Sequence, residues 1–169
     1  MAMQTDVLVA TLLNTGLLVN YRTRIKGLSV KGTNSAGAIE LFDSLTAPVA
    51  ATYARTSATI TVTKNGHGLS AGNQIGLSFA SGTGGSGTSG NYTIQTVPDA
   101  DTFTVTDINS GNVTAGANCL YASRWLLTFR FASGDVYTNY WPIPGQGILA
   151  KNAVHATMTN LTAVSIYYG

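Results

Sequence analysis

The stretch LLVNYRTRIKGLSVK, residues 17–31, decides the fold. Apolar or β-branched side chains recur in it at every second position through Val19, Tyr21, Thr23 and Ile25. A period of two places these side chains on one face of an extended chain, which is the pattern of a strand buried on one side. The stretch therefore predicts a long β-strand.

Four further stretches outside the middle of the chain have the same character. They are residues 38–43, 125–131, 148–158 and 163–168. Turns rich in Gly, Asn and Ser separate them, and short strands at this spacing are typical of sandwiches and barrels. We therefore predict an all-β protein with a β-sandwich or jelly-roll-like outer domain. The N-terminal VLVATLL, residues 7–13, is compatible with a strand or with one turn of helix.

The middle of the chain differs from its flanks. Residues 52–121 hold 11 of the 19 glycines and 13 of the 24 threonines, but neither tryptophan. Alternation at 59–63, 74–79, 92–97 and 102–106 predicts four strands. We predict a small β domain at residues 52–121, inserted between residues 1–51 and 122–169 of the outer domain. Its loop SGTGGSGTSG, residues 81–90, is expected to be flexible.

The composition excludes several classes of protein. Thr, Gly, Ser and Asn number 24, 19, 13 and 12 of 169 residues, a mixture that disfavours long helices. Charged residues make up 9% and the net charge is +2, so much of the surface is expected to be covered by copies of the chain or by partners. The start of the chain lacks a signal-peptide pattern, which predicts synthesis and folding in a reducing cytosol.

No chemical motif in the sequence predicts catalysis. Residues 82–87, GTGGSG, match a dinucleotide-binding pattern, but a strand follows them instead of the required helix. The histidines have no partner of ligand type at metal-site spacing; His67 is predicted to be a turn residue and His155 a half-exposed strand residue. Asp99 is predicted to form an Asx-turn, and Cys119 to be a small core residue. We therefore expect no catalytic, cofactor-binding or metal site, and no enzyme activity.

Basic residues cluster in the deciding stretch. Arg22, Arg24 and Lys26 would point to one side of the predicted strand, and Lys31 would follow its turn. Such a stripe fits docking on an acidic protein or phosphate-rich surface, or a solvated edge that blocks strand pairing. Nucleic-acid binding is the weakest interpretation, because few of the cations cluster.

Three aromatic residues fall near two prolines in a turn-rich segment. Tyr137, Tyr140 and Trp141 could anchor an interface, form a platform for a glycan, or plug the core. We predict the interface role, and an extended loop at residues 141–145.

The outer stretches resemble a group of small tailed-bacteriophage head proteins. The residues that carry this resemblance are NYRTRIKGL at 20–28, AIEL at 38–41, IPGQGIL at 143–149, VHATMTNL at 154–161 and IYYG at 166–169. The middle is similar to β modules that recur in phage structural proteins, through NGHGLSAGN at 65–73 and NYTIQTVPDADTFTV at 91–105. Such modules often have Asp where this chain has Asn73.

The resemblance implies a β-sandwich virion protein of the capsid decoration type. The expected partners are the major capsid protein and further copies of the chain, as a homotrimer on the capsid surface, without nucleic acid or membrane. The alternatives are a tail, fibre or adaptor component with host-glycan binding, and a free carbohydrate-binding module or hydrolase.

Overall fold

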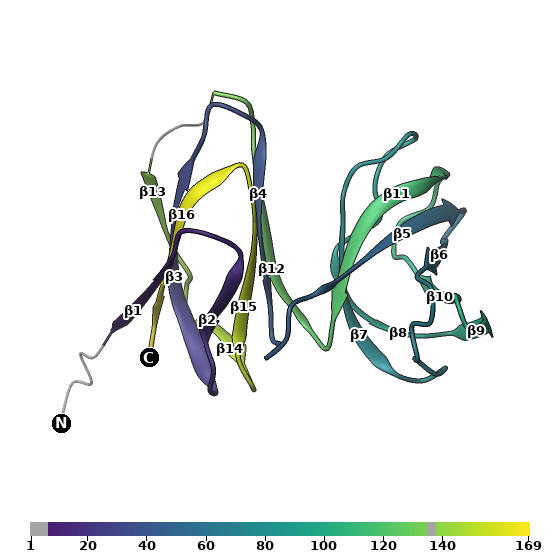
Figure 1. Cartoon of the computed structure of the whole chain (residues 1–169), viewed down its shortest axis with the longest axis horizontal. Helices are drawn as coiled ribbons and strands as arrows, with labels where there is room; N and C mark the ends of the chain where they lie inside the picture. Colours follow the sequence, from purple (N-terminus) through teal and green to yellow (C-terminus); the bar gives the residue numbers. More distant parts are fainter. Residues whose placement is uncertain (1–6, 135–137) are drawn as a thin grey trace. The chain divides into compact units, whose positions relative to one another are not determined.

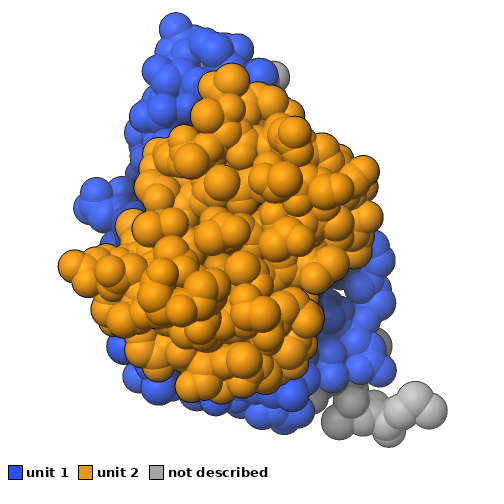
Figure 2. All heavy atoms as spheres, turned by 90° about the vertical axis from the view of Figure 1, so that its right-hand side faces the viewer, with its two compact units in different colours: residues 1–47, 126–169 blue, residues 48–125 orange. Residues whose placement is uncertain are grey.

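The computed structural model describes residues 7–134 and 138–169, which form β-strands joined by turns (Figure 1). This confirms the all-β prediction. The chain divides into two compact units, which Figure 2 colours separately: unit 1 contains residues 1–47 and 126–169, and unit 2 contains residues 48–125. The predicted insert, 52–121, was four residues shorter at each end. The difference arises because β5 (Val49–Thr56) and β11 (Val113–Ala122) pair with each other inside unit 2.

Unit 1 contains two antiparallel sheets. The first sheet, in spatial order, consists of β1 (Leu8–Leu12), β16 (Leu161–Tyr168), β3 (Thr23–Gly32) and β13 (Thr138–Pro142), and β14 (Ile148–Ala150) also pairs with β3. The second sheet consists of β12 (Trp125–Phe131), β4 (Gly37–Phe42), β15 (Val154–Thr159) and β2 (Gly16–Val19).

The two sheets share one hydrophobic core, so unit 1 is the predicted β-sandwich. The first sheet contributes buried residues of β3 and β16, among them Ile25, Leu28 and Ile166. The second sheet contributes buried residues of β4 and β15, among them Leu41 and Val154. Alternate residues of each strand face this core, which is the arrangement that the period of two predicts.

Unit 2 contains a single seven-stranded antiparallel sheet. Its spatial order is β8 (Gly90–Thr93), β7 (Gln74–Phe79), β11, β5, β6 (Thr59–Thr63), β10 (Thr102–Thr106) and β9 (Thr96–Asp99). Buried side chains of most of these strands, such as Tyr53, Leu77 and Phe103, form one separate core. Since one sheet supplies both walls of this core, the sheet curls around it (Figure 1).

Two separate cores lead to a prediction about excision. Replacing residues 48–125 by a short Gly/Ser linker should leave unit 1 folded, because its buried cluster contains no residue of unit 2. Circular dichroism should show a β spectrum and a cooperative thermal transition. An unfolded product beside a folded parent would contradict the prediction that unit 1 is an independent domain.

The strand predicted at residues 17–31 is wrong as one element. It is two strands, β2 in the second sheet and β3 in the first, joined by a turn at residues 20–22. The alternation continues across the turn because Val19 and Ile25 both face the same core, from opposite sheets. Tyr21, predicted to face inward, is exposed.

Two more predicted strands are interrupted. Residues 148–158 form β14 and β15, separated by a turn at residues 151–153. Residues 92–97 end β8 and begin β9, which lie at opposite ends of the unit 2 sheet. Between them the amides of Ile94 and Gln95 donate hydrogen bonds to carbonyl oxygens outside these two strands.

The sequence analysis underestimated the extent of strand at four places. The stretch at residues 7–13 contains the strand β1, while β5 and β11 were not predicted as strands. Trp141 and Pro142 complete β13 instead of beginning a loop. Pro142 is tolerated there because β13 lies at the edge of its sheet, where an N–H group is not required on the open side.

The loop at residues 81–90 is anchored, contrary to the expected flexibility. Gly82 and Gly85 exchange backbone hydrogen bonds of 2.7 and 3.1 Å. The amide of Gly87 donates to the hydroxyl of Tyr53 at 3.1 Å, and Gly87 is buried. A Cβ atom at Gly87 would lie 2.8 Å from the Phe79 ring, so this position requires glycine.

The two histidines occupy different environments. His67 stabilises its turn, as predicted: its Nδ1 accepts from the amide of Leu69 at 3.0 Å, and its Nε2 lies 3.2 Å from the carbonyl oxygen of Thr102. His155 was predicted to be half-exposed but is buried in β15, where alternate positions face the core and His155 faces away from it. Its Nδ1 has no hydrogen-bond partner among the described residues.

We expect His155 to make stability fall below neutral pH. Burial lowers the pKa of His155 from its ordinary value of 6.5, so the unfolded chain binds a proton more readily than the folded one. Stability should be greatest above about pH 6.5 and should decrease as the pH falls below it. Urea denaturation at both pH values should show this loss in the wild type and in His67→Gln, but a smaller loss in His155→Gln. An equal loss in all three would contradict it.

Candidate docking surface

The predicted basic stripe is placed by β3 and the turn before it. Arg22 precedes β3 and is exposed, and Arg24 lies on the face opposite to the buried Ile25. Lys26 has no partner in the register between β3 and β16, so it is a bulge residue. Lys31 lies within β3 and does not follow a turn. The cations therefore share one region of the first sheet, but not one uninterrupted strand face.

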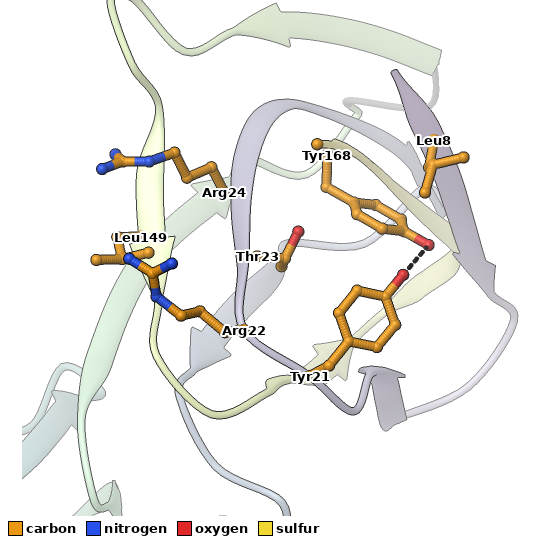
Figure 3. Close-up of a pocket in the computed structure, with 8 residues that line it drawn as sticks. Leu8, Tyr21, Arg22, Thr23, Arg24, Leu149 and Tyr168 are labelled. Carbon is orange, nitrogen blue, oxygen red and sulfur yellow. Dashed lines mark hydrogen bonds between the residues drawn. The ribbon is translucent and has the colours of Figure 1, made fainter. Parts of the chain in front are cut away.

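Arg22 and Arg24 line a shallow pocket of about 420 Å³ (Figure 3). The other lining residues are Leu8, Tyr21, Thr23, Leu149, Tyr168 and Gly169. The hydroxyl of Tyr21 donates a hydrogen bond to that of Tyr168 at 3.2 Å. The two rings lie edge to face, with their centroids 6.3 Å apart. In Figure 3 the guanidinium groups extend on the side of Leu149 and the tyrosine rings on the side of Leu8.

Lys26 is held in place by the segment that follows β13. Its Nζ donates to the carbonyl oxygen of Gln146 at 3.0 Å. Gly147 approaches β3 so closely that a Cβ atom there would collide with the carbonyl oxygen of Ile25, and its φ is 77°. The glycines of the IPGQGIL stretch therefore set the position of the chain around Lys26.

The exposed charge of unit 1 has one sign among the described residues. Glu40 and Asp43, the acidic residues of unit 1 within this range, are both buried. Glu40 lies 3.7 Å from Arg130, and Asp43 accepts hydrogen bonds from three backbone amides. The remaining acidic residues of unit 1, Asp6 and Asp135, lie outside the described residues. The exposed charged side chains described in unit 1 are therefore all cationic.

The three predicted interface aromatics are placed differently. Tyr137 lies outside the described residues. Tyr140 is 55% exposed, and its ring meets Tyr167 edge to face at 5.0 Å. Trp141 instead packs against the core of unit 1 and stacks on Phe129 at 5.4 Å. Tyr140 is thus exposed on the surface, whereas Trp141 is a core-packing residue.

Sequence reasoning missed the residues that complete the pocket. Leu8, Leu149 and Tyr168 are far from Arg22 in the sequence and reach it through the pairings β1–β16, β14–β3 and β16–β3. The exposed Tyr21 was assigned to the core. No local pattern signals these contacts, because they depend on which strands pair.

The described residues contain no group of three His, Cys, Asp or Glu side chains that could hold a metal ion. The Asx-turn prediction is confirmed: Asp99 accepts from the amide of Asp101 at 2.8 Å. Cys119 is a core residue, as predicted, and burial raises the pKa of its thiol to about 12. No helix long and apolar enough to cross a membrane occurs in residues 7–134 or 138–169.

No protein-family model and no curated protein sequence matches the chain. Among solved structures, the chain is similar to a protein described as phage phi92 endosialidase. The match has a TM-score of 0.35 and 24% sequence identity, and it covers 57% of this chain and 14% of that protein. The chain therefore spans far less than two thirds of that protein, and a similarity this low assigns no function.

Proposed function

We propose that the chain is a virion structural protein that decorates the outside of a phage head. In this proposal unit 1 docks on an acidic surface of the major capsid protein, with Arg22, Arg24, Lys26 and Lys31 as the contacting cations. One observation carries the docking mode: the carboxylates described in unit 1 are buried, so its described surface charge is cationic. Complementary charge accelerates encounter and selects an acidic partner over a basic one.

The assignment to a phage head is supported by the resemblance of the outer stretches to small head proteins. Those stretches supply β3, β14, β15 and β16, together with much of the pocket. Arginine guanidinium groups bind carboxylates in a planar two-point geometry, which suits acidic side chains on a shell. A homotrimer on the capsid surface, and the absence of nucleic acid and membrane partners, remain sequence-based predictions.

A tail, fibre or adaptor component is the second candidate. One observation favours it: the pocket combines two arginines with two tyrosine rings. Guanidinium groups bind carboxylates, such as that of an acidic sugar, and aromatic rings add apolar contact area. Quantitative mass spectrometry of purified virions distinguishes the two functions. Decoration requires many copies for each shell, in a fixed ratio to the major capsid protein. A few copies for each particle would contradict decoration and support the tail component.

Reversing the pocket charges should abolish docking. Arg22→Glu/Arg24→Glu should lower occupancy on heads that lack this chain at least tenfold, because two attractive contacts become repulsive. The fold should persist, since Arg22 is exposed and Arg24 lies on the outer face of β3. Cosedimentation with such heads measures the occupancy, and far-UV circular dichroism checks the fold.

A charge reversal in unit 2 is the matched control. Lys64→Glu changes the charge by the same amount for each substitution but lies outside unit 1. It should leave occupancy within about twofold of the wild type. Unchanged occupancy of the double arginine variant would return these residues to a solvated edge. A loss in Lys64→Glu half as large in free energy, for half the change in charge, would show a dependence on net charge alone.

A further inference from the structure

The first sheet of unit 1 has two very different edges. At one edge β13 ends in Pro142, and β14 is only three residues long. Proline and short strands are devices that prevent a sheet from pairing with another chain. At the other edge β1 pairs with β16 over five consecutive residues without a bulge, and its sequence LVATL contains neither charge nor proline. Among the described residues, the edge formed by β1 therefore carries none of these protective devices.

Exposed apolar side chains gather at this edge. Val7, Leu8, Val9 and Leu13 are 56%, 50%, 54% and 68% exposed. They fall within seven consecutive residues, although large exposed hydrophobic residues are few in the rest of the described chain. A local concentration of this kind marks an interaction site.

We propose that β1 pairs with β1 of a second copy of this chain, antiparallel and centred on Ala10. The stretch VLVATLL is self-complementary in this register. Val7 would face Leu13 of the other copy, Leu8 would face Leu12, and Val9 would face Thr11. Every pair then joins apolar or β-branched side chains, which are the pairs that stabilise neighbouring strands.

The register also preserves the two faces of the sheet. Ala10 and Leu12 pack towards the core of unit 1, whereas Val9 and Thr11 alternate with them on the outer face. Antiparallel pairing centred on a residue places inward side chains opposite inward ones and outward opposite outward ones. The small Ala10 meets its own copy at the two-fold axis. The first sheets of two copies therefore join into one continuous sheet.

The absence of charge favours a second copy over the acidic partner of the docking surface. Residues 7–19 contain no charged side chain, so two identical edges meet without like-charge repulsion. An acidic surface would gain nothing from this edge and would be drawn to the cations of β3. The inference is thus independent of the proposed function and gives a dimer, in place of the trimer predicted from the sequence.

A charge-pair design tests the register. Val9→Lys/Thr11→Lys places lysines opposite each other twice across the two-fold axis, whereas Val9→Lys/Thr11→Glu places opposite charges there. Both variants change outward-facing positions and lose the same hydrogen bond between Thr11 and Ser165. Sedimentation velocity of the full chain from about 1 to about 200 µM measures the mass of the species. Far-UV circular dichroism checks that each variant is folded.

We expect a concentration-dependent dimer for the wild type and for the Lys/Glu variant, and at least a tenfold higher dissociation constant for the Lys/Lys variant. Leu45→Lys/Ile108→Lys, at exposed apolar residues outside β1 in the sequence, should dimerise like the wild type. A monomer at all concentrations, a trimer, or a dimer unaffected by the Lys/Lys change would overturn the inference. So would loss of the dimer in both charge variants, because the register would then be wrong. Heads are absent from this experiment, so its failure leaves the proposed docking untouched.

Discussion

Arg55→Met is expected to destabilise unit 2 by about 3–5 kcal/mol, because it leaves a buried carboxylate without its counter-charge. Nη1 of Arg55 lies 2.7 Å from Oδ2 of Asp107, and the side chains are 7% and 0% exposed. Nε of Arg55 also donates to the carbonyl oxygen of Gly111 at 3.0 Å. Methionine fills a similar volume but supplies neither the charge nor the donors.

The pair also holds the loop at residues 81–90. Oδ2 of Asp107 accepts from the amide of Thr88 at 3.1 Å, and Oδ1 accepts from the amide of Asn109 at 3.2 Å. Losing the arginine therefore loosens the carboxylate that anchors this loop. Hydrogen exchange should rise first at residues 81–90 and 107–111 of Arg55→Met, while the amides of unit 1 keep their protection.

A second substitution separates charge from packing. Arg55→Met/Asp107→Asn removes the uncompensated charge but retains an acceptor for the loop amides, so it should be more stable than Arg55→Met alone. Urea denaturation gives both free energies of unfolding. A double variant no more stable than the single one would show that the buried charge is not the cause.

The pair also has a pH signature at the acidic end of the range. Burial alone would raise the pKa of Asp107, but hydrogen bonds from Thr88, Arg55 and Asn109 outweigh burial and lower it below its ordinary value of 3.8. A lowered folded pKa means that the stabilisation is present above about pH 4 and is lost as pH falls further. This window is distinct from that of His155, whose effect begins near neutrality.

Much of the fold could be predicted from alternation, because strand faces are a local property. The strands β6, β7 and β10 begin and end where the pattern does. The turn at residues 20–22 could not be predicted. Val19 and Ile25 face the same core from opposite sheets, so the alternation of inward-facing residues continues across the turn. The burial of His155 was also missed, because a polar residue in a strand is usually half-exposed.

Of the candidate site, only the cluster of basic residues could be predicted from the sequence. Arg22, Arg24 and Lys26 are neighbours in the sequence, so their cluster is visible there. The sequence does not show that the exposed charges described in unit 1 are all positive, because this depends on the burial of Glu40 and Asp43. The pairing of β14 and β16 with β3 then adds the rest of the pocket. Contacts between strands far apart in the chain decide these features.

Asp43→Ala is expected to destabilise unit 1 by about 3–5 kcal/mol, since it removes one carboxylate that serves three backbone amides. The amides of Lys151, Asn152 and Ala153 donate to Asp43 at 2.7, 2.8 and 3.1 Å. These amides belong to the turn that separates β14 from β15. Because β14 lies in the first sheet and β15 in the second, Asp43 fixes the turn by which the chain passes from one sheet to the other. Asp43 is 1% exposed, and water cannot readily replace its oxygens.

The control for Asp43 is an exposed carboxylate with a similar role. Asp99 also accepts from a backbone amide, but it lies in a solvent-exposed turn where water can take its place. Asp99→Ala should therefore lower the unfolding midpoint much less than Asp43→Ala. Burial opposes ionisation of Asp43, but the three amides outweigh it and lower its pKa, so the stabilisation should vanish as pH falls below about 4. If Asp43→Ala and the wild type instead kept the same free-energy difference from pH 7 to pH 3, the ionised carboxylate would not be what holds this turn.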